Sequence, residues 1–111
     1  MKLVIPPEIQ VGGHKYSIAF NENLKDDNDY GRVNHRLQKI ELNPARPTSQ
    51  RVEALIHELL HVISNVYADR KLEEGDISAV SEGLLQVFQQ LDIELDFSQI
   101  KEEEILKEVT N

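Results

Sequence analysis

The hydrophobic pattern of the chain changes at two prolines, Pro44 and Pro47, and this change limits the fold more than any other feature. Before them, short apolar segments alternate with turn residues, which is typical of strands. After them, from about Thr48 to Tyr67, apolar residues recur at the i, i+3, i+4 and i+7 spacing of a helix. Because proline continues neither a strand ladder nor a helix interior, the sequence predicts a sheet region followed by helices, an α+β fold.

Two hairpins are expected in the sheet region, residues 1–43. Apolar alternation on both sides of Gly12 predicts the first, because glycine tolerates the positive φ of a tight turn. A second pair of strands, within Tyr30–Asn43, would turn near His35. The polar segment between them, residues 21–29, is expected to be a loop. The pattern therefore predicts an antiparallel sheet of three or four strands.

Two or three helices should follow the sheet. The first runs from about Thr48 to Tyr67, and the second from about Glu74 to Leu91. A third, short helix over Ser98–Val109 is a further possibility. The apolar positions expected on one face of the second helix are Ile77, Val80, Leu84, Val87, Phe88 and Leu91.

The length of 111 residues is that of one domain. We expect a single domain over 1–111, with the sheet in 1–43, the two main helices in 48–91 and an acidic segment in 92–111. The chain has no cysteine, which excludes disulfides, thiol nucleophiles and thiolate zinc sites. A formal net charge of −8 argues against binding to nucleic acid or to an anionic membrane. No secretory signal or membrane-spanning stretch is visible, so we expect a cytoplasmic protein.

The residues that carry chemistry are His57, Glu58 and His61, an HExxH motif inside the first helix. Residues four apart lie one turn apart on the same side of a helix, so the two imidazoles can occupy adjacent corners of a tetrahedral zinc site. Glu58 can direct its carboxylate at a water that the metal activates, as a general base for hydrolysis. The apolar stripe of this helix centres near Ile63, and at about 100° per residue both histidines fall well away from it. We therefore expect an open site.

A hydrolytic zinc also needs a third protein ligand. Without cysteine, the candidates are carboxylates near the start of the second helix and two distant histidines: Glu73, Glu74, Asp76, Glu82, His14 and His35. Glu82 is expected to face water, because it projects from the side opposite the apolar stripe of its helix. Geometry alone does not select among the others.

The motif and the residues after it resemble the small HExxH metallopeptidase-like proteins of phages and prophages, which are similar to the gluzincins and to the ImmA/IrrE group. The resemblance is carried by His57–Ile63, Leu72–Ile77, Val80–Ser81 and Gly83–Leu84, and more weakly by Tyr30–Val33 and Gln38–Leu42. It implies a minimal zincin-like fold and one zinc ion per chain, bound by His57, His61 and Glu74. Glu73 and Glu82 are the alternative third ligands. The chain departs from gluzincins at Ser78, where those enzymes carry an acidic residue.

These observations predict a zinc-dependent peptidase that cleaves a peptide or protein substrate and is encoded by a phage or prophage in a bacterial host. Tyr67 and His35 are candidate groups for stabilising the oxyanion, as are Tyr30 and Arg36. The resemblance also implies that the strand Leu37–Leu42 is the sheet edge that accepts an extended peptide. The alternative is a catalytically silent metal-binding protein that serves as an interaction or regulatory module. The sequence leaves the substrate and the oligomeric state open.

Overall fold

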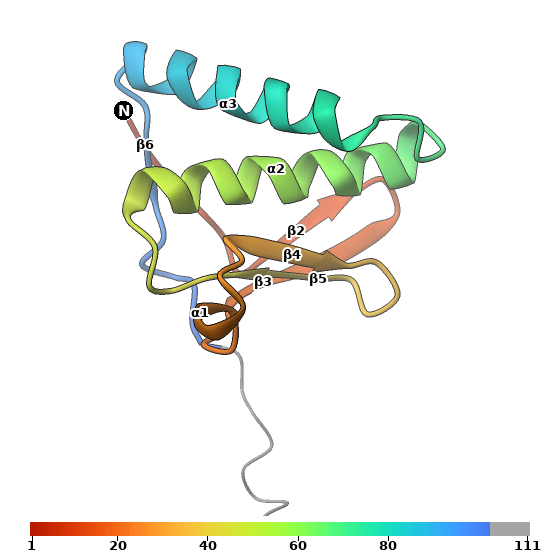
Figure 1. Cartoon of the computed structure of the whole chain (residues 1–111), viewed down its shortest axis with the longest axis horizontal. Coiled ribbons are helices and arrows are strands. Elements are labelled where there is room, and N and C mark those ends of the chain that lie inside the picture. The colour runs from red at the N-terminus through yellow and green to blue at the C-terminus, as the bar shows by residue number, and fades with distance from the viewer. Residues whose placement is uncertain (103–111) are drawn as a thin grey trace, which may run out of the picture.

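Helix α2 (Thr48–Tyr67) lies between a four-stranded sheet on one side and helix α3 (Glu74–Gln90) on the other (Figure 1). The structure is a computed structural model and describes residues 1–102. The remaining elements are β1 (Lys2–Val4), β2 (Glu8–Val11), β3 (His14–Phe20), α1 (Leu24–Asp27), β4 (Gly31–Asn34), β5 (Lys39–Leu42) and β6 (Glu94–Asp96). The prediction of an α+β fold, with a sheet followed by two long helices, is confirmed.

The main sheet has the strand order β2-β3-β5-β4. Both predicted hairpins are present, because β2 pairs with β3 and β4 pairs with β5 in antiparallel fashion. The central pair, β3 and β5, is parallel, so the prediction of a wholly antiparallel sheet is wrong. The chain passes from β3 through α1 to the outer strand β4 and returns along β5 into the interior. This order buries Ile40, Glu41 and Leu42 of β5 and leaves the Arg32 side chain of β4 exposed.

Strand β4, and not the predicted Leu37–Leu42 segment, is therefore an edge of the sheet. The prediction failed because the β4–β5 hairpin has the same internal hydrogen bonds whether β4 or β5 pairs with β3, so its sequence does not show which strand lies at the edge. Burial of Ile40 and Leu42, both fully covered, favours β5 in the middle. At the opposite edge, the β2–β3 turn needs Gly12, whose φ is +60° and whose added Cβ would lie 2.8 Å from Cγ1 of Val66.

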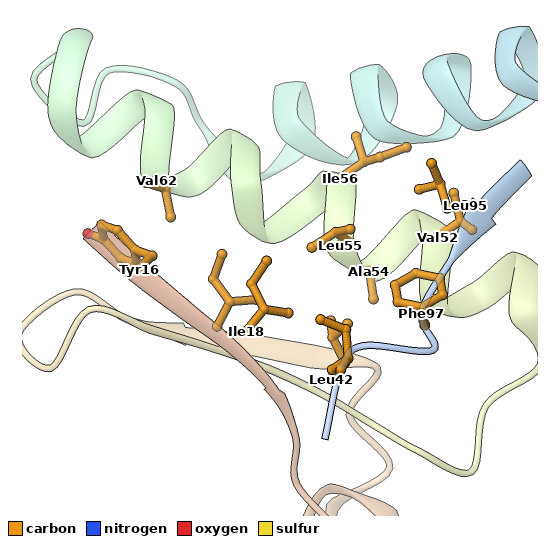
Figure 2. Close-up of a cluster of buried hydrophobic side chains, with 12 residues drawn as sticks. Tyr16, Ile18, Leu42, Val52, Ala54, Leu55, Ile56, Val62, Leu95 and Phe97 are labelled. Carbon is orange, nitrogen blue, oxygen red and sulfur yellow. The ribbon is translucent and has the colours of Figure 1, made fainter. Parts of the chain in front are cut away.

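The core lies between the sheet and α2 (Figure 2). Tyr16 and Ile18 of β3 and Leu42 of β5 point at the face of α2 that carries Leu55 and Val62. The prediction that the apolar face of this helix centres near Ile63 is wrong, because Ile63 itself is 41% exposed. The sheet covers one side of α2 and helix α3 covers the other, so the buried residues of α2 spread over a wide arc of its circumference. The average direction of its apolar residues therefore does not identify the buried face.

Helix α3 begins at Glu74, as predicted, and ends one residue earlier than expected, at Gln90. It buries Ile77 and Ser81 and half-buries Leu85 and Phe88. The other four residues of its predicted apolar face are exposed: Val80, Leu84, Val87 and Leu91. No helix in the part of the chain that the structure describes is long and apolar enough to cross a membrane.

After α3 the chain returns to the first residues. Strand β6 pairs with β1 in parallel, with Leu3 opposite Leu95, a pairing that the sequence did not predict. Residues 98–102 are not helical, so the expected helix over Ser98–Val109 is wrong for that part. Its remainder, residues 103–109, lies outside the described residues.

Candidate metal centre

The two histidines of the HExxH motif project from the middle of α2, with ring centroids 5.0 Å apart. The turn after α2 brings the next helix back to them. Asp69 and Arg70 have positive φ, and the backbone N–H of Arg70 donates to the Ser64 carbonyl oxygen at 2.9 Å. The hydroxyl of Ser64 accepts a further hydrogen bond from the N–H of Leu72. This tight reversal starts α3 directly beside α2.

Glu74, the first residue of α3, completes a group of three potential ligands with His57 and His61. Its carboxylate oxygens lie 2.7 Å from Nε2 of His57 and 2.9 Å from Nε2 of His61. One ligand atom from each residue lies within 4.8 Å of the other two. The predicted residues are thus brought together by the fold, and the group could bind a metal ion.

The donor set suits zinc, which takes imidazole nitrogen and carboxylate oxygen at about 2.0–2.2 Å. Tetrahedral geometry then separates neighbouring ligand atoms by roughly 3.3 Å. Glu74 would have to move outward by a few tenths of an ångström, which its side chain, 67% exposed, leaves it free to do.

The alternative third ligands lie outside this group. Glu73 is the N-cap of α3, where its side chain accepts a hydrogen bond from the backbone of Asp76 and forms a capping box. Glu82 lies about two turns further along α3 and is exposed, as expected. His14 lies at the β2–β3 turn, where its Nδ1 is 3.1 Å from Nε2 of Gln38.

Glu58, the residue after His57 on α2, is buried, with only 7% of its surface exposed. Burial, together with the charges of Glu74 and Asp29, raises the pKa of its carboxyl group from 4.5 to about 7. No hydrogen bond joins its side chain to another residue within 1–102. A carboxyl group with a pKa near neutrality can both accept and return a proton, whereas a nearby divalent cation would lower that pKa.

A cavity of about 220 Å³ opens beside His57 and Glu58. Its other lining residues come from β4 and the residue before it, from α2 and from α3: Tyr30, Gly31, Glu53, Ala54, Ser78, Ser81 and Glu82. Edge strand β4 approaches α2 closely here: a Cβ atom added to Gly31 would lie 3.4 Å from the Cβ atom of Ala54. Sequence reasoning missed Glu53, although its position four residues before His57 places it on the same side of α2.

His35 and Tyr67, two of the candidates for stabilising an oxyanion, differ in position. Nδ1 of His35 lies 3.0 Å from the hydroxyl of Tyr16, and its pKa is lowered by burial and by the charges of Arg70 and His61. His35 is thus close enough to His61 to sense its charge. Tyr67 is 68% exposed, and its hydroxyl lies beside Gly12 in the β2–β3 turn, so the structure does not bring it to the ligands.

Comparison of the chain with protein-family models, curated proteins and solved structures finds no match. Function is therefore inferred from the geometry of the site.

Proposed function

We propose that the protein is a zinc-dependent peptidase with a gluzincin-like site, encoded by a phage or prophage and acting in the bacterial cytoplasm. One observation carries the proposal. A buried carboxyl group, Glu58, lies next to a group of two histidines and a glutamate and lines a cavity that solvent can enter. A structural metal site has no use for such a group, because its coordination is closed.

His57, His61 and Glu74 would hold one zinc ion. When bound, zinc lowers the pKa of a coordinated water and polarises a carbonyl oxygen. Glu58 takes the proton of the attacking water and passes it to the leaving amine.

His35 is better placed than Tyr67 to stabilise the oxyanion. When the hydroxyl of Tyr16 donates to Nδ1, the neutral ring carries its proton on Nε2, which can then donate to a substrate oxygen. Because its pKa is lowered, the ring is neutral at neutral pH and stabilises the oxyanion by a hydrogen bond.

Strand β4 is the proposed binding edge for an extended peptide, in place of Leu37–Leu42. It is an edge of the sheet, and Gly31 at its start lines the cavity beside Glu58. An added strand would gain main-chain hydrogen bonds from β4 and would bring its scissile bond past the ligand group.

A second function, a metal-binding interaction or regulatory module without catalysis, is favoured by the thin packing of α3. That helix buries Ile77 and Ser81 and leaves most of its apolar residues exposed. A metal held by Glu74 would fix its first turn against α2, as structural ions do in small domains.

Two measurements separate these functions. Native mass spectrometry should find one zinc per wild-type chain and none in His61→Ala; an unloaded wild-type protein at neutral pH would contradict both. Glu58→Gln should keep its zinc and lose hydrolysis of a mixed peptide library. The matched control is Glu94→Gln, an exposed residue of β6, which should retain both. If the library stays uncut by zinc-loaded wild type, the non-catalytic function is supported instead.

A further inference from the structure

The cavity beside the ligand group has acidic walls. Glu53 and Glu58 line it from α2, and Glu82 lines it from α3. The described residues that line the cavity include no lysine or arginine, and the imidazole among them, His57, belongs to the ligand group. Within residues 1–102, neither Glu53 nor Glu82 forms an ion pair, so their charges act on whatever enters the cavity.

The rest of the lining is small or neutral. Ala54 and Gly31 leave room, and Ser78 and Ser81 contribute hydroxyl groups. Arg46 lies 4.3 Å from the ring centroid of the lining residue Tyr30 and is hydrogen-bonded to Asn28. The volume of about 220 Å³ equals roughly seven water molecules, which is enough for one long side chain.

Glu58 gives an independent indication that this cavity receives a ligand. Its side chain is more than nine-tenths buried, has no hydrogen-bond partner in the described chain, and lines the cavity. A buried polar group without a protein partner is costly unless water or a bound molecule in the cavity satisfies it. Glu58 therefore presents its carboxyl group to whatever occupies the cavity, and two further carboxylates, Glu53 and Glu82, determine what else the cavity can hold.

We propose that this cavity is a specificity subsite for a cationic group of the peptide substrate, with Glu53 and Glu82 as its charge partners. The inference rests on the proposed peptidase function and adds a substrate class to it. The cation is a lysine or arginine side chain next to the cleaved bond, or the free α-amino group of the peptide. Both present N–H donors to carboxylates, and a peptide lying along β4 brings either to the mouth of the cavity.

The first experiment measures cleavage. Zinc-loaded wild type is given matched peptides that carry lysine, arginine, norleucine or glutamine around the scissile bond, each with a free or an acetylated N-terminus. We expect kcat/KM to be about tenfold higher for the cationic peptides, the effect of two partly exposed ion pairs. The double variant Glu53→Gln/Glu82→Gln should lose this preference, and Glu94→Gln should keep it. If acetylation removes the preference, the α-amino group is the cation; if it does not, the side chain is.

The second experiment measures binding without catalysis. Zinc-loaded Glu58→Gln is titrated with the same peptides. The titration is repeated with the triple variant Glu53→Gln/Glu58→Gln/Glu82→Gln. Cleavage without a cationic preference overturns the subsite and leaves the peptidase. Selective binding of cationic peptides without cleavage by wild type overturns the peptidase and supports the subsite. If wild type cleaves nothing and the variant binds nothing, both proposals are wrong.

Discussion

Replacing Glu58 by glutamine should stabilise the metal-free protein above pH 7, although the same change should abolish catalysis. The glutamate is buried, and burial is the main reason that its pKa is raised from 4.5 to about 7. Glutamine has a similar shape and carries no charge at any pH. The variant therefore isolates the free energy of ionising this one carboxyl group inside the folded protein.

The size of the effect follows from the pKa. Below pH 4.5 the carboxyl group is protonated in both the folded and the unfolded chain and contributes nothing. Between pH 4.5 and 7 the unfolded chain loses its proton first, so the free energy of unfolding falls as the pH rises. Above pH 7 the full penalty, about 3 kcal/mol, is present. Glu58→Gln lacks this penalty, so its advantage should grow from near zero at pH 4.5 to about 3 kcal/mol at pH 8.

The assay is urea unfolding followed by circular dichroism, with a chelator present, at four values between pH 4.5 and pH 8. The exposed control Glu94→Gln should stay within about 0.5 kcal/mol of wild type throughout. With excess zinc in place of the chelator, the cation favours the ionised carboxylate and the advantage should shrink. An advantage that is the same at pH 4.5 and pH 8, or a variant that is less stable than wild type at pH 8, would refute the reasoning.

Three further predictions concern other positions. Glu74→Gln should weaken zinc binding by about a hundredfold or more, whereas the neighbouring Glu73→Gln should leave it within about threefold, as competition with a chromophoric chelator would measure. Glu41 is buried, which alone would raise its pKa, but the hydrogen bonds and charge of Arg32 and its other partners lower it overall. The contribution of the ionised Glu41 to the free energy of unfolding is therefore present above pH 4.5 and lost as the pH falls through the lowered pKa. Glu41→Gln should cost about 1–3 kcal/mol at pH 7 and less near pH 3, as urea unfolding would measure. An equal cost at the two pH values would contradict this. Gly31→Ala should cost about 1–3 kcal/mol in thermal unfolding, because its Cβ would lie 3.0 Å from the carbonyl oxygen of Glu41, and a neutral result would show that β4 can shift.

Local patterns predicted the two long helices and the positions of His57 and His61, but they missed the short helix α1 within the segment expected to be a loop. The period of apolar residues gave the bounds of α2, and the HExxH spacing placed His57 and His61 on one side of it. The resemblance to the phage proteins indicated Glu74, and the tight turn around Ser64 is what brings that residue to the histidines. These features depend on residues close in sequence, where helix geometry fixes the distances.

The strand order and the helix faces depend on distant contacts, so local patterns could not predict them. The choice of β4 over β5 as the edge is decided by burial against β3 and α2. The β1–β6 pair joins strands of three residues each that lie about ninety residues apart in the chain. Three residues are too few to show a period, and nothing near them in the sequence indicates the partner.

The shallow seating of α3 on α2 has a mechanical consequence. With Ile77 and Ser81 as its buried anchors, the helix depends on its first turn, where Glu74 meets the two imidazoles. An ion shared by the three side chains would crosslink the two helices across a short connection. Because Ser78, Ser81 and Glu82 of α3 also line the cavity, the same ion would hold one ligand and one wall of the cavity in place together.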